Sequence, residues 1–396
     1  MSAGPAPGPR ILPGTLINGQ SATLGVMGGG QLARMFVHAA QRMGYFTAVL
    51  DPDPQSPAGL VSHHHIQTAY TDPQGLQQLI ACSAAITTEF ENVPAPALRT
   101  LAEQRPVAPG ADAVAIAQDR IAEKAHFKRC GVPCAPYAVI ETAEQVTSVG
   151  ANLFPGILKT ARLGYDGKGQ LRVKTREELK AAWGELKQVA CVLEKMLPLK
   201  SECSVIVARG VDGNIVNFPV QLNWHREGIL AVTEVFEGNV PPALAQKAIE
   251  AAKSIATGLS YVGVLCVEFF VLQDNSLVVN EIAPRPHNSG HYTHNACDQS
   301  QFDLQVRTLA NLPLVQPGLL CPAIMLNLLG DIWQAFTDAP PWDQVLALPG
   351  THLHLYGKTQ ARAGRKMGHL NITGSSIAQV RATALAAAKL LGIAPF

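Results

Sequence analysis

The chain has 396 residues, more than one ordinary domain holds, so its length predicts two or three domains. Charged residues make up only 15% of it and the net charge is +1, which excludes the basic surface typical of nucleic-acid-binding proteins. No apolar run reaches the roughly 18 residues of a membrane span. The eight scattered cysteines include no C-x-x-C pair, so we expect a cytoplasmic protein with reduced thiols and no membrane contact.

Residues 1–20 are rich in proline and glycine and lack the apolar core of a signal peptide, so we expect a flexible arm. Residues 21–118 alternate strand-like and helix-like segments. The stretch "TLGVMGGGQLARMFVHAAQRMGYFTAVLD" reads as a strand, a glycine turn, a helix that ends at Gly44, and a second strand. Asp72 and Pro73 give the cap and first turn of a further helix. The alternation predicts an α/β domain with a doubly wound parallel sheet.

Longer strands follow from about residue 119. Segments such as "ECSVIVARGVDGNIVNFPV" return as hairpins, which predicts an α+β domain with antiparallel sheets over residues 119–320. From about Cys321, short strands such as "THLHLYGK" and an Ala-rich helix near Ile377–Leu391 predict a small C-terminal domain over residues 321–396.

The glycine turn, "GVMGGGQLARM", suggests a phosphate site. A glycine-rich turn after a strand lets the N-terminus of a helix meet a phosphate, and Asp51 ends the second strand, where dinucleotide-binding proteins hold a ribose. An NAD-dependent dehydrogenase is therefore one interpretation of this stretch. Its spacing is G-x-x-G-G-G and not G-x-G-x-x-G, so a tight turn without a ligand is the alternative.

A second glycine-rich stretch, "ILKTARLGYDGKGQ", follows an apolar strand that ends at Lys159. Its loop contains three glycines, a tyrosine and two charged residues: Gly164, Tyr165, Asp166, Gly167, Lys168 and Gly169. Backbone N–H groups of such a loop can fold over phosphates, and no G-K-[ST] closes it as in a P-loop. A nucleotide lid and a plain glycine-rich hairpin both fit this pattern.

The stretch "VEFFVLQDNSLVVNE" predicts a hairpin with Asp274 and Asn275 as a two-residue tip. In that register Glu268 faces Glu281, with Cβ atoms about 4.5–5.5 Å apart. Two opposed carboxylates beside apolar neighbours destabilise a sheet unless a shared proton or a hard cation neutralises them. The hairpin therefore predicts a Mg²⁺ site, and two solvated glutamates at a sheet edge are the alternative.

Polar residues crowd the loop after this hairpin: Arg285, His287, Asn288, Ser289, His291 and His294. The three histidines suggest zinc, but Pro286 and Gly290 prevent a helix from presenting them on one face, so we favour substrate hydrogen bonding. Four basic residues gather around glycines in the tail: Lys358, Arg362, Arg365 and Lys366. That pattern suits a phosphate monoester, and a solvated basic loop is the alternative.

Taken together, six motifs resemble the ATP-grasp superfamily and, within it, the 5-(carboxyamino)imidazole ribonucleotide synthase family. In chain order they are "GGGQLARM", "LDPDPQSPA", "TTEFENV", "GYDGKGQ", "NEIAPRPHNSGHYT" and "GRKMGHLN". The resemblance runs from about Thr23 to Leu391. It implies a pre-ATP-grasp α/β domain, an ATP-grasp domain that clamps ATP, a small C-terminal domain, and a homodimer.

The resemblance also implies roles for individual residues. ATP would be bound by Arg120, Lys159, Gly164, Tyr165, Asp166, Gly167, Lys168, Gly169, Gln170, Glu194, Lys195, Met196, Leu197, Glu202, His225, Asn280 and Glu281. The ribonucleotide would be bound by Gln31, Leu32, Glu89, His287, Lys358, Arg365 and Lys366. Mg²⁺ would be held by Glu268 and Glu281, and catalysis would involve Asp166, Lys159 and Tyr165. Many superfamily members carry an asparagine two residues after the second metal glutamate, where this chain has Ala283.

The implied activity is that of a ligase in purine biosynthesis. ATP would phosphorylate bicarbonate to carboxyphosphate, and the exocyclic amine of 5-aminoimidazole ribonucleotide would be carboxylated. A formate-dependent glycinamide ribonucleotide formyltransferase is the alternative within the same fold. An NAD-dependent dehydrogenase is the alternative from another class.

Overall fold

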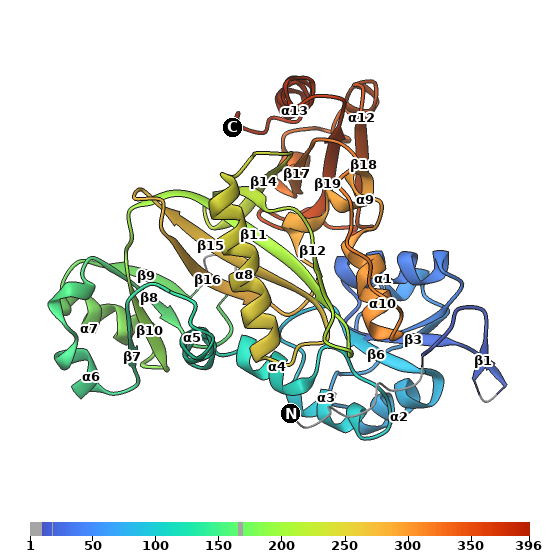
Figure 1. Ribbon diagram of the computed structural model, residues 1–396, viewed down its shortest axis with the longest axis horizontal. Coiled ribbons are helices and arrows are strands. Elements are labelled where there is room, and N and C mark those ends of the chain that lie inside the picture. The colour runs from blue at the N-terminus through green and yellow to red at the C-terminus, as the bar shows by residue number, and fades with distance from the viewer. Residues whose placement is uncertain (1–9, 18, 165–168) are drawn as a thin grey trace.

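The computed structural model describes residues 10–17, 19–164 and 169–396, which form three lobes around a central sheet (Figure 1). Part of the expected flexible arm is packed: Ile11 is buried in the core of the first lobe, and its backbone N–H donates to Ala310 O at 3.0 Å. Strands β1 (Leu16–Ile17) and β2 (Gln20–Ser21) then pair as a short hairpin. Ile11 therefore anchors the segment at one point, while residues 12–17 are exposed, and the flexible arm stays a prediction.

The first lobe is an α/β unit with one parallel sheet. Its elements are β3 (Thr23–Met27), α1 (Gln31–Arg42), β4 (Phe46–Leu50), β5 (His64–Ile66), α2 (Pro73–Cys82), β6 (Ala85–Thr88), α3 (Ala95–Ala102) and α4 (Ala111–Ala117). The strands lie in the order β5-β4-β3-β6, with α1 packed on one face and α2 and α3 on the other. The doubly wound sheet is thus confirmed. Asp72 caps α2 by accepting from Gln74 N, and Gly44 follows α1 with a φ of +88°.

The second lobe is a smaller antiparallel sheet with three helices, drawn in green at the left of Figure 1. Its elements are α5 (Arg120–Arg129), β7 (Tyr137–Ile140), α6 (Ala143–Ser148), β8 (Gly156–Thr160), β9 (Gln170–Val173), α7 (Arg176–Glu185) and β10 (Cys191–Lys195). The strands lie in the order β7-β10-β8-β9, and α6 and α7 cover the sheet around their own apolar core. This lobe therefore shares no strand with the central sheet.

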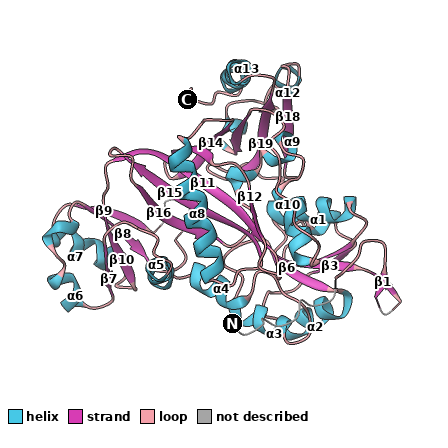
Figure 2. Cartoon of the chain, in the orientation of Figure 1, coloured by secondary structure: helices cyan, strands magenta, loops and turns pink. Residues whose placement is uncertain are grey.

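The central sheet has long antiparallel strands. The elements that follow β10 are β11 (Leu199–Arg209), β12 (Ile215–Asn217), β13 (Gln221–Arg226), β14 (Ile229–Val235), α8 (Pro242–Gly258), β15 (Gly263–Leu272), β16 (Leu277–Ala283), α9 (Thr293–Ala296) and α10 (Gln301–Leu309). Helix α8 lies across the strands and packs on β11 and β15 (Figure 2). Helix α10 contacts α1, so the central sheet and the first lobe are packed together.

The C-terminal segment extends the same sheet. Its elements are β17 (Ala323–Leu329), α11 (Asp331–Gln334), α12 (Trp342–Leu346), β18 (Thr351–Leu355), β19 (Lys366–Thr373) and α13 (Ile377–Leu390). Strand β17 pairs with β14, which gives the continuous order β16-β15-β11-β13-β14-β17-β19-β18. The expected small C-terminal domain is therefore built on the outer strands of the central sheet.

Four histidine rings meet where the C-terminal strands contact the loop after β16. His369 lies 4.5 Å, ring centre to ring centre, from both His291 and His354, and His294 lies 5.3 Å from His354. His354 Nε2 lies 2.9 Å from Asn295 Oδ1. Burial lowers the pKa of each ring, to about 3 for His294 and about 4 for His354, so the four imidazoles are neutral. We call these four residues the histidine cluster.

Across the described ranges 10–17, 19–164 and 169–396, no helix combines the length and apolarity needed to cross a membrane.

Candidate active site

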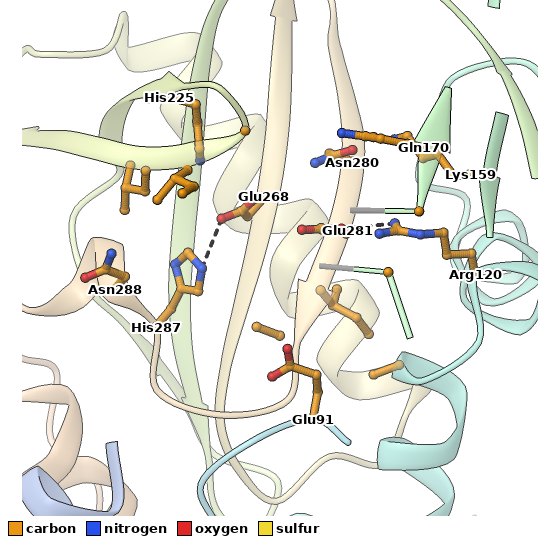
Figure 3. Close-up of a pocket in the computed structure, with 18 of the residues that line it drawn as sticks. Glu91, Arg120, Lys159, Gln170, His225, Glu268, Asn280, Glu281, His287 and Asn288 are labelled. Carbon is orange, nitrogen blue, oxygen red and sulfur yellow. Dashed lines mark hydrogen bonds and ion pairs between the residues drawn. The ribbon is translucent and has the colours of Figure 1, made fainter. Parts of the chain in front are cut away.

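A cavity of about 1270 Å³ opens between the first lobe, the second lobe and the central sheet with its C-terminal strands, and Figure 3 shows part of its lining. Every described residue predicted for the site lines it: Gln31, Leu32, Glu89, Arg120, Lys159, Gly164, Gly169, Gln170, Glu194, Lys195, Met196, Leu197, Glu202, His225, Glu268, Asn280, Glu281, His287, Lys358, Arg365 and Lys366. The predicted residues Tyr165, Asp166, Gly167 and Lys168 lie outside the described residues. The fold therefore brings together side chains that are more than 300 residues apart in the sequence.

Glu268 and Glu281 face each other across β15 and β16, as predicted. The turn that brings the two strands into this pairing differs from the predicted two-residue turn. The turn has three residues, Gln273–Asn275, because Leu272 N donates to Ser276 O at 2.9 Å, and Asn275 adopts a φ of +62°. This shifts the register by one residue, and a bulge at Asn280 shifts it back.

The two glutamates have different surroundings. Arg120 lies 3.0 Å from Glu281 and, although burial opposes it, holds the pKa of that carboxyl below its ordinary value. Burial and the charge of Glu281 raise the pKa of Glu268 to about 7. His287 Nε2 lies 3.1 Å from Glu268 Oε1 (Figure 3). Glu268 is therefore partly protonated near neutral pH, while Glu281 stays ionised beside Arg120.

The residues present fit a hard divalent cation. Asn280, the extra residue of the bulge, has an Oδ1 that is buried and makes no hydrogen bond to any described residue. It lies beside Glu281 on the wall that also carries Glu268 (Figure 3). Two carboxylates and an amide oxygen form a donor set that Mg²⁺ accepts. Ala283 offers no side-chain oxygen.

Helix α5 contributes buried charges that the sequence interpretation missed. Lys124 Nζ lies 3.0 Å from Glu194 Oε1, and Lys159 Nζ lies 3.2 Å from Glu194 Oε2. Glu123 accepts from Ile282 N at 2.8 Å, and burial raises the pKa of Glu123 to about 8. The signal was the i, i+3, i+4 spacing of Arg120 with these residues, which places all three on one face of a helix.

On the opposite side of the cavity, Glu202 and His225 form a pair. His225 Nδ1 lies 2.9 Å from Glu202 Oε2, on neighbouring strands β13 and β11. Although burial opposes it, the hydrogen bond to Glu202 raises the pKa of His225. This pair therefore presents a carboxylate with an adjacent imidazole, which suits the hydroxyl groups of a sugar and a phosphate oxygen.

The glycine turn is occupied by the chain's own carboxylates. Glu89 accepts from Gly30 N at 2.8 Å, and Asp51 accepts from Gly29 N at 2.7 Å. A Cβ on Gly30 would lie 2.3 Å from Glu89 Oε1, and Gly28 has a φ of +98°, so glycine is required at both positions. The dinucleotide interpretation loses its basis, because Asp51 and the N-terminus of α1 are already engaged. Glu89 still lines the cavity.

The basic segment of the tail closes the remaining wall. Lys358 Nζ donates to Lys366 O at 2.8 Å, and Arg365 Nη1 donates to Gln360 O at 2.9 Å. Burial and the charge of Arg365 lower the pKa of Lys358 to about 8. Arg285, one of the polar residues of the loop after β16, is half-buried and paired with Glu91. This wall of the cavity therefore carries several basic side chains that are half-buried.

Comparisons with known proteins give one answer across the chain. Three family models match: the ribonucleotide synthetase preATP-grasp domain over residues 21–118, the ATP-grasp domain over residues 125–302, and the phosphoribosylaminoimidazole carboxylase C-terminal domain over residues 323–383. The N5-carboxyaminoimidazole ribonucleotide synthase of Brucella melitensis is 43% identical over 356 residues, which are 88% of this chain and 95% of that protein.

Solved structures agree. An ADP complex of N5-carboxyaminoimidazole ribonucleotide synthetase matches with a TM-score of 0.88 and 40% identity, over 96% of this chain and 97% of the other. The Aspergillus clavatus enzyme, in complex with ADP and 5-aminoimidazole ribonucleotide, matches with a TM-score of 0.85 and 31% identity, over 94% and 99%. Because sequence and structure match over nearly the full length, the chain belongs to the N5-carboxyaminoimidazole ribonucleotide synthase family of ATP-grasp ligases.

Proposed function

We propose that the protein carboxylates the exocyclic amine of 5-aminoimidazole ribonucleotide, using ATP and bicarbonate through carboxyphosphate. The products are 5-(carboxyamino)imidazole ribonucleotide, ADP and phosphate, and the reaction belongs to purine biosynthesis. The observation that carries the proposal is that one cavity has two charged walls. The Glu268–Glu281 pair with Arg120 suits a nucleoside triphosphate, and Lys358 with Arg365 suits a phosphate monoester.

Mg²⁺ is the cation we assign to the glutamate pair. Glu268, Glu281 and the Asn280 amide oxygen would hold it, and it would supply charge stabilisation at the phosphates of ATP. Arg120 and Lys159 would contact phosphate oxygens directly. Glu194, Lys195, Met196 and Leu197 would line the adenine, and Glu202 with His225 would take the ribose and a phosphate oxygen.

The carboxylation step needs water to be excluded and a proton to be removed. The loop that contains Gly164, Gly169 and Gln170 would cover the phosphates and protect carboxyphosphate from hydrolysis. Asp166 would accept the proton that the amine loses as the C–N bond forms, with Tyr165 and Lys168 beside it. Gln31, Leu32, Glu89 and His287 would position the ribonucleotide. A cytoplasmic homodimer with domains at residues 21–118, 119–320 and 321–396 completes the proposal.

The test is ADP release by the purified protein with all substrates and with each omitted. We expect release to require both bicarbonate and 5-aminoimidazole ribonucleotide. Release supported by formate and glycinamide ribonucleotide would instead assign the formyltransferase activity. Quenching of NADH fluorescence by the protein would return the dehydrogenase to consideration.

Arg365→Ala is expected to raise the Michaelis constant for the ribonucleotide about 10- to 100-fold and to leave that for ATP nearly unchanged. A charge-assisted hydrogen bond to phosphate contributes about 1.5–3 kcal/mol, which gives this range. Steady-state kinetics with each substrate varied separately would measure both constants. Arg172→Ala removes a cation from the nucleotide side of the same cavity and serves as the control. If the Michaelis constant for ATP rises for Arg365→Ala instead, the basic segment binds ATP and not the ribonucleotide, which contradicts the proposal.

Affinity for the ribonucleotide is expected to fall as pH rises through about 8. Lys358 has a lowered pKa of about 8, so it is a cation below that pH and loses its charge above it. The substrate phosphate stays doubly charged over the same range, so the attraction weakens because of the lysine. The profile of kcat/KM for the ribonucleotide would show an alkaline limb. Lys358→Met should remove this limb, and a limb that persists would assign the titration to another group.

A further inference from the structure

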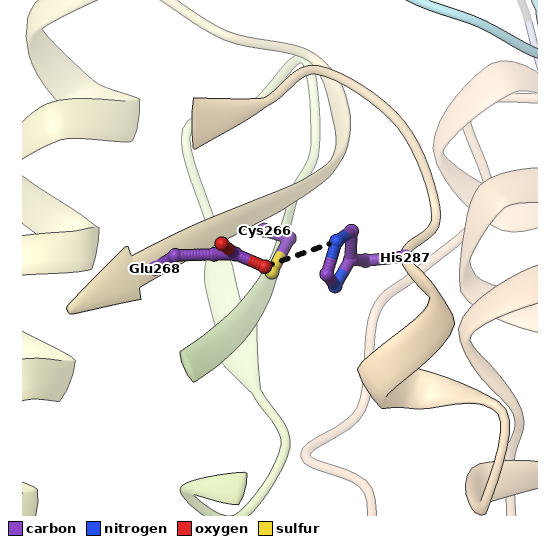
Figure 4. A group of neighbouring side chains, drawn as sticks. All are labelled: Cys266, Glu268 and His287. Carbon is purple, nitrogen blue, oxygen red and sulfur yellow. Dashed lines mark ion pairs between the residues drawn. The ribbon is translucent and has the colours of Figure 1, made fainter. Parts of the chain in front are cut away.

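Cys266 has no role in the proposed reaction, but it lies beside two residues that do, Glu268 and His287. Cys266, Glu268 and His287 each point one donor atom toward a common point, and the thiol, carboxylate and imidazole atoms all lie within 4.8 Å of one another (Figure 4). We propose that these three residues form a site for Zn²⁺. Glu268 would be a ligand of both Zn²⁺ and Mg²⁺, whereas of the two cations only Zn²⁺ would bind the thiol of Cys266 and the imidazole of His287. The proposal rests on the proposed function only for the role of Glu268.

The backbone fixes the three donors independently. Cys266 and Glu268 are two residues apart on β15, so their side chains leave the same face of the sheet, and Glu268 is held opposite Glu281 by the strand pairing. His287 comes from the loop after β16 and points back toward the strand (Figure 4). Cys266 is fully buried, while Glu268 and His287 keep 13% and 14% of their side-chain surface exposed. A cation can therefore enter from the cavity and meet the thiol behind the other two donors.

The histidine has the supporting contact that zinc ligands commonly have. His287 Nδ1 lies 2.9 Å from Ser289 Oγ, which in turn lies 2.9 Å from Ser204 Oγ. Asn223 Nδ2 donates to Ser204 at 2.8 Å, so the chain of contacts is anchored in the sheet. Ser289 N also donates to His287 Nδ1 at 3.3 Å, so Nδ1 accepts and Nε2 carries the ring proton toward Glu268. Binding of Zn²⁺ at Nε2 would move that proton to Nδ1, which would then donate to Ser289 Oγ, the outer hydrogen bond that orients a zinc ligand.

Charge and ligand type favour Zn²⁺ over Mg²⁺ at this point. A thiolate, a carboxylate and a neutral imidazole cancel the two positive charges of the cation, which suits a buried site. Mg²⁺ takes oxygen ligands and avoids sulfur, whereas Zn²⁺ takes sulfur, nitrogen and oxygen with four ligands in total. Binding releases the thiol proton to solvent, and no electron is transferred. The fourth position would hold water from the cavity.

The histidine-only zinc interpretation of this loop stays rejected, for a structural reason. His291 and His294 turn away from His287 into the histidine cluster, where His291 stacks on His369 at 4.5 Å. The ligand that completes a set with His287 is a cysteine from a strand about twenty residues earlier, which the loop sequence does not reveal.

The direct test uses Co²⁺ as a spectroscopic probe of the chelator-treated protein without nucleotide. We expect a thiolate-to-cobalt charge-transfer band in the near ultraviolet, absent in Cys266→Ala and in Cys266→Ser, which keeps the size of the side chain. Cys130→Ala is the matched control, because Cys130 Sγ also lies near a histidine, 3.3 Å from His126 Nε2. A band that survives in both Cys266 variants, or is lost in Cys130→Ala, overturns the proposal.

Equilibrium dialysis against Zn²⁺ gives the affinity. Loss of the thiol should weaken Zn²⁺ binding by at least about 100-fold, no less than the loss of a supporting contact costs at a zinc site. Zn²⁺ should also inhibit Mg²⁺-dependent ADP release, because both cations need Glu268, and the inhibition should weaken in Cys266→Ala relative to that variant's own rate in Mg²⁺ alone. Inhibition of equal strength in both proteins overturns the site. Absent ADP release in the parent protein would count against the proposed function, and the cobalt spectrum would still decide this proposal.

Discussion

Glu281→Gln is expected to lower ATP-dependent turnover by at least about 100-fold at limiting Mg²⁺, since a lost interaction with the transferring charge costs several kcal/mol. The change removes one of two facing carboxylates and keeps the size of the side chain. The melting temperature should move by no more than about 3 °C, because the lost ion pair with Arg120 is offset by relief of the repulsion with Glu268. Raising the Mg²⁺ concentration should restore part of the rate.

The measurement is initial ADP release against Mg²⁺ concentration, with thermal unfolding of the same samples. Glu227→Gln makes the same chemical change at an exposed position of the cavity wall and is expected to keep the parent rate. Near-parent turnover of Glu281→Gln at limiting Mg²⁺ would reject the metal assignment. A large fall in melting temperature would show that the carboxylate is needed for folding instead.

Acidification from about pH 7.5 to about pH 5 is expected to lower the free energy of unfolding by several kcal/mol through the histidine cluster. A histidine whose folded pKa is lowered stays neutral while the unfolded chain takes up a proton below about pH 6.5. The unfolded state then binds more protons, so stability rises with pH and is lost as pH falls from about 6.5 toward the folded values, about 4 for His354 and about 3 for His294. Each histidine that stays neutral in the folded state lowers the free energy of unfolding by about 2 kcal/mol at pH 5.

The charged groups around the cluster do not reverse this sign. Asp303 favours the protonated form of His294, but Arg42 and the neighbouring histidines oppose it. Urea unfolding at both pH values would measure the loss. His354→Phe keeps an aromatic ring without a titrating group and should recover about 2 kcal/mol of the difference between the two pH values. The exposed His64, changed to glutamine, is the control. An equal loss in His354→Phe would assign the acid sensitivity elsewhere.

The sequence predicted the facing glutamates, although through the wrong turn. Asp274 and Asn275 favour a tight turn, and a two-residue tip brings Glu268 opposite Glu281. The turn has three residues because Asn275 takes the left-handed conformation, and the bulge at Asn280 compensates. A bulge depends on how side chains pack around the cavity, and the alternation of apolar and polar residues along one strand does not encode that packing.

Contacts between distant segments could not be predicted from local patterns. The Lys124–Glu194 pair joins residues 70 positions apart, and the histidine cluster joins the segment after β16 to two C-terminal strands. The alternating histidines in "THLHLYGK" did indicate that His352 and His354 share a face of a strand. The partner of that face depends on how β18 and β19 dock, and docking is decided by tertiary packing.

The strands from β16 to β18 form one continuous sheet, so the central sheet and the C-terminal strands are a single rigid unit. The glutamates on β15 and β16 and Lys366 at the start of β19 are linked through the backbone hydrogen bonds of the intervening strands. Their separation is therefore fixed by the sheet. The four-stranded sheet β7-β10-β8-β9 shares no strand with this unit, so the hydrogen bonds of the central sheet do not fix its position.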